Sequence, residues 1–572
     1  MGIQPAAGAS LFSAVWAAIA VGLLVQLALE LEVRPVATIM VALLFALSTS
    51  MWVDASIAEV HTMTMALTFA VLLAAVRFGR TGRVGALYWL AFLAGQGLAH
   101  QRAFGFLGLG LLVLVLPQWR AVRRKMPVVI GLGLLGLLTY VYIPLQGWAG
   151  AIWQFEPISW KNLLAKMTDT KADAIVVLPQ SLVELWARLT RVTGLLADDW
   201  PPLFLLAGLS GLLLLRWSAS RVERWGLTLS WLPYLLVSLI IWEGQISDAL
   251  LAVKLPVVAL GALGLALLTL RAWQWKSVLG KGLVLAWVLA AALLYLDHRP
   301  TVLALTRDDT AQEWITLASQ LGPDPEGRQT TFLAFWGNPY WRLAYAQEFE
   351  GQIPHLHLVH HNQDLGALLC TGHRVVTYSQ SFRTKSIDWW EQYCTGWRIH
   401  LSSVAPGVVE IKTKPQVEAI GPAAAYLHVF DGSLAIREVT ISPVTSDTIR
   451  VAVAWQALND NLNDYGAAVQ IVAGERPCML EAIISQVAQA HLAGGSYPSS
   501  RMVRGEVVWD HVELTTTDGA RWLCIRMLAG ESGWLYYRDQ DWLMLPLQAG
   551  QVSAWFGGAD AERALPVAEE GQ

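Results

Sequence analysis

Long apolar stretches alternate with short polar ones through the first three hundred residues, and the pattern then changes. A helix of about 17 to 25 apolar residues is long enough to cross a hydrocarbon core of ~30 Å. The stretches predict about ten spans, near residues 11–29, 35–53, 59–76, 84–99, 103–118, 127–145, 201–216, 225–243, 249–270 and 280–296. We therefore expect a polytopic α-helical membrane bundle over residues 1–300.

The chain after residue 300 is mixed and polar, with two different periodicities. Over 301–412, strand-like runs (331–335, 355–359, 374–378) alternate with helix-like runs (310–321, 339–349), which predicts an α/β domain. Over 413–572, alternating runs at 448–455, 467–472, 506–514 and 520–527 are separated by turn residues, which predicts a β-sandwich of jelly-roll type as an accessory domain.

Composition agrees with a membrane protein. The chain is 55% hydrophobic and 15% charged, and its mean hydropathy is +0.44. Many of the 28 tryptophans flank apolar runs, as in the aromatic belts at membrane interfaces. The net charge of -4 gives no basic surface for nucleic acid.

Basic residues cluster in alternate loops, near residues 77–83, 120–125, 216–224 and 271–281, which is the positive-inside pattern. This orientation places the 54–59 turn, the 100–102 turn, the 146–200 loop and everything after Asp297 outside a plasma membrane. It also places residue 1 outside, so we expect that a span upstream of this chain is missing. In the outer loop, residues 159–167 and 182–192 have the spacing of amphipathic helices that lie in the interface.

The first candidate site is the polar interruption between the second and third predicted spans. It holds Asp54, Glu59 and His61, and the two carboxylates are the only acidic residues between Glu32 and Glu156. Charged groups near bilayer depth are costly and usually face a bundle interior or a cavity. Glu59 and Asp54 could act as a general base or hold a divalent ion, whereas the structural alternative is capping of the following helix.

Two further turns on the same side carry candidate phosphate ligands. Arg102, beside His100, is suited to a phosphate or diphosphate headgroup, and the alternative is contact with ordinary lipid phosphate. Asp248 and Lys254 lie at the start of the ninth span, where Lys254 either contacts phosphate or pairs with Asp248.

Other motifs give weaker indications. The run His355–His361 has alternate histidines but no convincing set of metal ligands, and no cofactor-binding fingerprint is present, so we expect no metal or cofactor apart from an open possibility of a divalent cation. The four cysteines all lie in the polar half, which favours two disulfides, with Cys370–Cys394 and Cys478–Cys524 as one pairing; four free thiols are the alternative.

Several of these stretches together resemble one family. The 45–61 stretch with its core Ala58-Glu59-Val60-His61, the turn 97–102 and the motif 140–145 are similar to a bacterial membrane family of uncharacterised function related to protein O-mannosyltransferases. The resemblance covers residues 8 to 380 approximately. The chain departs from the family pattern at His61, Gln101 and Lys254, and it lacks the family's first span and the long outer loop that holds its acidic catalytic residue.

The resemblance implies a GT-C glycosyltransferase that transfers a sugar from a polyprenyl-phosphate donor to a protein or glycan acceptor outside the membrane. Because the family's long outer loop is missing, we expect the catalytic role to fall to Glu59 and Asp54, and we expect His61, His100, Arg102, Asp248 and Lys254 to bind the donor phosphate or the acceptor. A non-catalytic membrane anchor for a carbohydrate- or envelope-binding domain is the competing interpretation. A transporter is disfavoured because no inverted repeat is evident.

Overall fold

A computed structural model describes the chain at residues 5–149, 178–213, 221–240, 248–324, 326–335, 338–360, 363–370, 372–393, 397–460, 462–473, 483–517, 519–529, 536–547 and 554–557. The chain divides into two compact units, Met1–Asp308 and Asp309–Gln572. Each unit is described by itself.

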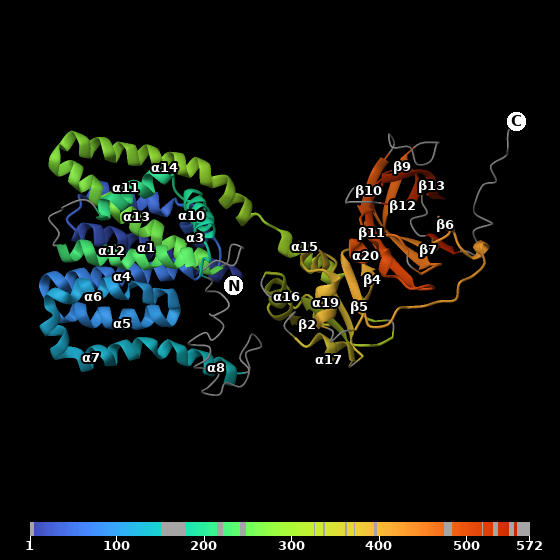
Figure 1. Cartoon of the computed structure of the whole chain (residues 1–572), viewed down its shortest axis with the longest axis horizontal. Coiled ribbons are helices and arrows are strands. Elements are labelled where there is room, and N and C mark those ends of the chain that lie inside the picture. The colour runs from blue at the N-terminus through green and yellow to red at the C-terminus, as the bar shows by residue number, and fades with distance from the viewer. Residues whose placement is uncertain are drawn as a thin grey trace. The chain divides into compact units, whose positions relative to one another are not determined.

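The first unit is a bundle of helices (Figure 1). Among the described residues, five helical segments are long and apolar enough to cross a membrane, or six if the bent pair α2–α3 is one span. This is fewer than the ten expected, because other apolar stretches form shorter helices, such as the 17 residues of α5 and the 12 residues of α11. The helices are α1 (Pro5–Glu30), α2 (Pro35–Ala46), α3 (Thr49–Ser56), α4 (His61–Thr81), α5 (Val84–His100), η1 (Arg102–Leu107), α6 (Gly108–Val115), η2 (Leu116–Gln118), α7 (Trp119–Leu137), η3 (Leu138–Val141), α8 (Tyr142–Trp148), α10 (Leu182–Ala197), α11 (Pro202–Leu213), α12 (Arg221–Ile240), α13 (Asp248–Trp275) and α14 (Ser277–Thr306).

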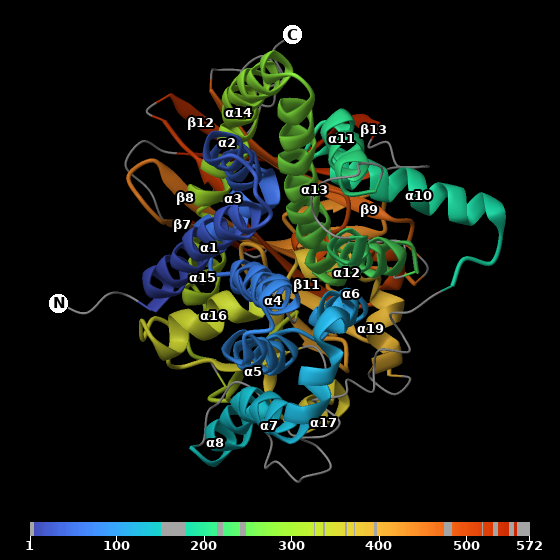
Figure 2. The same ribbon diagram turned by 90° about the vertical axis from the view of Figure 1, so that its left-hand side faces the viewer.

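Glycines set the close approach of several helix pairs. Figures 1 and 2 show α4, α5 and α7 lying side by side in a row, and Gly95 of α5 lies directly against the backbone of Gly133 in α7. In the same way, Gly208 of α11 faces Gly264 of α13, where any Cβ would collide with the opposite backbone. Membrane helices use small residues at such contacts because lipid gives no hydrophobic driving force for helix association.

A charged cluster ties three helices together at the end of α4. The guanidinium of Arg80 donates to the carboxylate of Glu223 in α12 and to the backbone carbonyl of Glu30 at the end of α1. Arg77, one turn earlier, donates to the Glu30 carboxylate at 2.7 Å. These cations are therefore paired within the bundle, at the end of the helices that the sequence predicts to be cytoplasmic.

The second unit begins with an α/β region. Its sheet has the order β2-β1-β3-β5-β4, with β1 parallel to both β2 and β3 and with β5 antiparallel to β3 and β4. Every residue of β1 and β3 is buried. The elements are α15 (Thr310–Ser319), β1 (Thr330–Ala334), α16 (Asn338–Glu348), β2 (His357–His360), α17 (Leu365–Cys370), β3 (Arg374–Tyr378), α18 (Gln380–Thr384), α19 (Ile387–Tyr393), β4 (His400–Ala405) and β5 (Val408–Lys412).

The remainder of the second unit is built from two antiparallel sheets. One has the order β10-β9-β12-β13, and the other has β11-β8-β7-β14 with β6 paired to β7. Apolar residues of both sheets, such as Val451 of β8 and Ile471 of β9, belong to one buried core. The elements are η5 (Ala423–Ala425), β6 (His428–Phe430), β7 (Leu434–Pro443), β8 (Thr448–Ala457), β9 (Tyr465–Ala473), β10 (Ile483–Gln489), α20 (Leu492–Gly495), η7 (Ser499–Arg501), β11 (Val507–Thr515), β12 (Ala520–Ala529), β13 (Tyr536–Pro546) and β14 (Ala554–Gly557).

The structure tests part of two further predictions, the amphipathic helices of the 146–200 loop and the disulfides. The amphipathic pattern at 182–192 forms α10, whose first turn is capped by the Ser181 hydroxyl accepting from the Glu184 N–H at 3.1 Å, whereas the pattern at 159–167 lies outside the described residues. Cys524 is disulfide-bonded. Cys394, Cys478 and the side chain of Cys370 lie outside the described residues, so the proposed pairing stays a prediction.

Candidate functional site

The polar interruption predicted as a site begins with a sharp elbow between α2 and α3. The two helices meet at a bend of 68°, separated only by Leu47 and Ser48. The Ser48 hydroxyl donates to the Phe45 carbonyl at 2.8 Å and accepts from the Met51 N–H at 3.4 Å. Ser48 therefore ends one helix and caps the next, and α3 turns away from the direction of α2.

A break of this kind leaves backbone carbonyls without intrahelical partners, which is costly in a membrane. Two side chains from distant parts of the chain satisfy them. The indole N–H of Trp200 donates to the Leu44 carbonyl at 3.2 Å, and His298 Nδ1 lies 2.7 Å from the Leu47 carbonyl. His298 must carry its proton on Nδ1 to make this bond. The elbow is thus fixed by the protein around it.

Asp199 holds the beginning of α3. Its carboxylate accepts from the backbone N–H and the hydroxyl of Ser50, both at 2.6 Å, and lies 3.3 Å from the Lys254 ammonium. The Asp199 side chain is fully buried and that of Lys254 is 11% exposed. A carboxylate at a helix N-terminus complements the helix dipole, and the ammonium completes the compensation of its buried charge.

Asp54 lies one helical turn beyond Ser50 on α3, and its carboxylate is close enough to Glu59, Asp199 and Lys254 for their charges to act on it. Asp54 is therefore subject to the charges of two carboxylates, Glu59 and Asp199, and of one ammonium, Lys254. We call these four residues the elbow cluster. With every group ionised it carries a net negative charge, which suits it to accept a proton or to attract a cationic or hydroxyl-bearing partner.

The turn that carries Glu59 is fixed by its neighbours. The Ser13 hydroxyl of α1 donates to the Glu59 carbonyl at 2.8 Å and accepts from the Glu59 N–H at 3.0 Å. His100 Nε2 at the end of α5 lies 2.9 Å from the Val60 carbonyl. Both backbone groups of Glu59 are occupied, so its side chain is presented from a rigid turn.

The Glu59 carboxylate itself is accessible. Its side chain is 41% exposed, and its Oε2 lies 3.9 Å from Nε2 of His61, the first residue of α4. A protonated imidazole at that distance stabilises the carboxylate, and a neutral one leaves it free to accept a proton. Glu59 and His61 are therefore placed for proton transfer to or from a molecule at the mouth of the bundle.

The remaining predicted residues are placed less centrally. Arg102 is exposed at the first position of η1, two residues after His100. Lys254 pairs with Asp199, which neither sequence interpretation considered, and the side chain of Asp248 lies outside the described part of the chain. Within the described residues, no three His, Cys, Asp or Glu side chains come together as metal ligands.

Three residues of this site were not singled out from the sequence for the roles they have here: Asp199, Ser50 and His298. A signal existed in the acidic pair Asp198-Asp199 directly before Trp200, at the end of a loop read as interfacial. A second signal was the polar run Ser48-Thr49-Ser50 inside a stretch read as one span. Neither pattern says which distant residue it contacts.

These observations define a class: a membrane-embedded helical bundle with an elbow that concentrates ionisable groups, followed by a region rich in β-sheet. No family model matches the sequence, and no curated protein matches it. Among solved structures, the chain is similar to ArnT from Cupriavidus metallidurans bound to undecaprenyl phosphate, with 12% identity and a TM-score of 0.43 over 72% of this chain and 85% of that one. The apo state of ArnT gives 12% and 0.42 over 71% and 83%. Likeness at this level carries no inference about the chemistry of this chain.

Proposed function

We propose that the protein is a membrane glycosyltransferase that transfers a sugar from a polyprenyl-phosphate donor to a protein or glycan acceptor on the extracytoplasmic side. The observation that supports this most directly is the elbow cluster. Buried carboxylates and an ammonium are expensive within a membrane bundle, and residues of this kind commonly mark a reaction or transport site.

The reaction is a displacement at the anomeric carbon. The acceptor hydroxyl oxygen forms a bond to that carbon, and the bond from the carbon to the phosphate oxygen breaks with its electron pair leaving on the lipid phosphate. The acceptor proton passes to a carboxylate acting as general base. We assign this base to Glu59, because its carboxylate is accessible, rigidly carried and 3.9 Å from His61.

The departing phosphate requires positive charge. Arg102 is exposed on the turn after α5 and can form paired hydrogen bonds with phosphate oxygens. We assign the donor phosphate to Arg102, together with His61 and His100. Lys254 is held by Asp199, so we assign these two residues to positioning α3 and Asp54.

The test is transfer of labelled hexose from a polyprenyl-phosphate donor by the purified full chain. We expect Glu59→Gln to lower the rate by about 10²-fold or more, the usual contribution of a general base. Arg102→Ala should lower it by about tenfold or more, the loss of one charge-assisted hydrogen bond. Glu350→Gln and Arg120→Ala remove the same charges from exposed positions and should leave the rate unchanged.

An unfolding temperature equal to that of the unaltered protein would show that each variant is folded. Unchanged rates in both Glu59→Gln and Arg102→Ala would overturn the proposed site.

The second candidate is a non-catalytic membrane protein that displays its β-rich region for carbohydrate or envelope binding. It is favoured by the fact that Lys254 and His100 already contact protein atoms, as in a purely structural network. That function predicts that the protein binds glycan without transferring sugar, and that neither Glu59→Gln nor Arg102→Ala changes the binding.

A further inference from the structure

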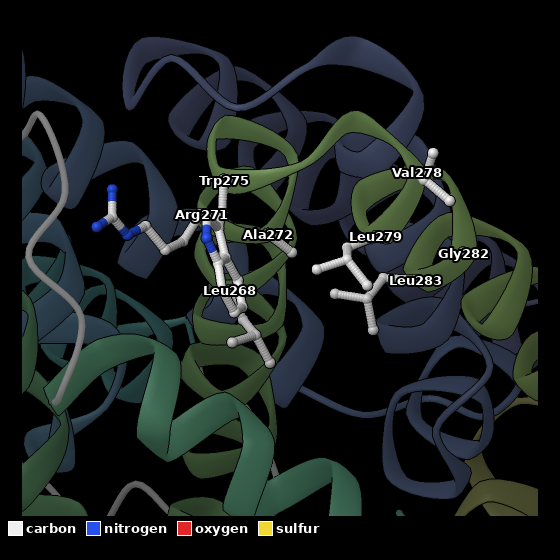
Figure 3. A pocket seen from close by; sticks show the side chains of 8 residues that line it. All are labelled: Leu268, Arg271, Ala272, Trp275, Val278, Leu279, Gly282 and Leu283. Carbon is white, nitrogen blue, oxygen red and sulfur yellow. The ribbon is translucent and has the colours of Figure 1, made fainter.

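The hairpin formed by α13 and α14 has an apolar groove on its side. The groove has a volume of 830 Å³ and lies where α13 ends and α14 begins. Figure 3 shows Leu279 and Leu283 of α14 pointing toward Ala272 and Trp275 of α13, whereas the Arg271 side chain extends away from the gap. The groove is thus apolar between the helices, and the Arg271 guanidinium lies on the side of α13 away from α14.

The hairpin is closed tightly on its other side, which leaves the groove preformed. A Cβ on Gly280 would lie 2.6 Å from Trp273, so α14 packs directly on that indole. The guanidinium of Arg34 lies over the same indole at 4.6 Å. By contrast, a Cβ on Gly282 in the groove would meet nothing within 4 Å. The space along Gly282 is open without any rearrangement.

The groove belongs to a surface suited to hydrocarbon. Val278 at its rim is 76% exposed, and the outward leucines Leu285, Leu289 and Leu293 of α14 are 60%, 58% and 67% exposed. Large apolar side chains in this number on one helix require an apolar environment, which the bilayer supplies. Because the helices that form it cross the membrane by length and composition, an acyl chain is the apolar group present at that depth.

The positive charge at the end of the hairpin indicates that the lipid headgroup is anionic. Arg271, Lys276 and Lys281 are all exposed within the eleven residues 271–281 around the turn, and no Asp or Glu occurs between Asp248 and Asp297. Exposed Trp275 stands beside them, as expected at a membrane interface. Basic pockets between membrane helices on the cytoplasmic side bind anionic lipid headgroups, and the basic clusters assign this end to that side.

We propose that the α13–α14 groove is a binding site for an anionic phospholipid, with an acyl chain along Gly282 and Leu283 and the phosphate at the basic end of the hairpin that carries Arg271, Lys276 and Lys281. This inference is independent of the proposed catalytic function, because the groove and the elbow cluster share no residue.

The test is native mass spectrometry of the full chain in detergent, titrated with phosphatidylglycerol or with phosphatidylcholine of the same chains. We expect phosphatidylglycerol to bind more tightly. Arg271→Ala should weaken its binding about fivefold, the effect of one basic residue at a membrane surface. Gly282→Phe should fill the groove and lower phosphatidylglycerol binding by about tenfold.

Matched controls exist on α7. Gly131 is also exposed, with nothing within 4 Å of its Cβ position, and Arg124 is an exposed cation, so Gly131→Phe and Arg124→Ala should bind lipid as the unaltered protein does. Equal binding of the two phospholipids, or unchanged binding by Gly282→Phe, would overturn the proposal. Preference for undecaprenyl phosphate over phosphatidylglycerol would also overturn it, by assigning the groove to a polyprenyl chain.

Discussion

The ion pair of Asp199 and Lys254 offers a quantitative test of how the elbow is held. Asp199 is fully buried and has two hydrogen bonds from Ser50 besides the ammonium at 3.3 Å. Removing one partner of a buried pair usually costs about 3 to 5 kcal/mol, because the other charge is left uncompensated. The two single substitutions should nevertheless differ.

Asp199→Asn leaves Lys254 with the charge of Asp54, with which it already interacts. Its cost should therefore lie at the lower end of that range, about 3 kcal/mol. Lys254→Met leaves the buried Asp199 and the neighbouring Asp54 without their cation, so its cost should reach about 4 kcal/mol. In the double variant the pair is absent and the cost should be at least about 1 kcal/mol below the sum of the singles.

The assay is reversible unfolding of the full chain in mixed micelles, with the free energy of unfolding of the unaltered, two single and double variants forming one cycle. Asp198→Asn is the matched control, because the neighbouring carboxylate belongs to an exposed residue. Costs below about 1 kcal/mol for both singles, or strict additivity, would refute the assignment of Asp199 and Lys254 as the residues that hold α3.

Three further predictions concern the rest of the molecule. The guanidinium of Arg328 donates to Asp324 and lowers the pKa of that carboxyl to about 2. The ionised Asp324 therefore contributes about 2 kcal/mol to the free energy of unfolding above pH 4, and this contribution is lost as the pH falls toward 2. In unfolding measurements over a pH series, Asp324→Asn should weaken the loss of stability between pH 4 and pH 2. Burial raises the pKa of Asp510 to about 6, so the free energy of unfolding should rise as the pH falls from 7 toward 4. Asp510→Asn, whose amide oxygen can still accept from the Gly494 N–H, should abolish that rise, and the same dependence on pH in this variant would contradict the prediction. Gly264→Leu should prevent α11 from packing on α13 and abolish recovery of monodisperse protein, whereas Gly22→Leu, where a Cβ meets nothing within 4 Å, should not.

The sequence predicted the second unit more closely than the first. Alternation bounded by turn residues placed β3 at 374–378 as the structure has it and placed β1, β8, β9, β11 and β12 within a few residues of their observed ends. These strands are each buried on one or both faces, so a few neighbouring residues show the strand pattern of apolar positions and turn residues. Membrane helices lack this contrast, because apolar side chains face both the bundle and the lipid.

The elbow shows why the candidate site was found only in part. Its polar residues Asp54, Glu59 and His61 were visible because charge interrupts an apolar run. The bend between α2 and α3 was missed, since Leu47 to Ser50 is short and the flanking residues are apolar enough to be read as one span over 35–53. What makes the bend stable lies elsewhere in the chain: Trp200 and His298 satisfy the carbonyls that it frees.

The bend between α2 and α3 sets the position of Asp54. A helix break inside a membrane persists only where distant side chains pair the freed backbone groups, so the position of Asp54 on α3 depends on residues more than a hundred positions away. Substituting His298 by Phe keeps an aromatic ring but removes the bond to the Leu47 carbonyl. If α3 positions Asp54 for the reaction, His298→Phe should lower sugar transfer although His298 is not assigned any contact with the substrate. Sugar transfer by His298→Phe at the rate of the unaltered protein would show that the elbow does not control the site.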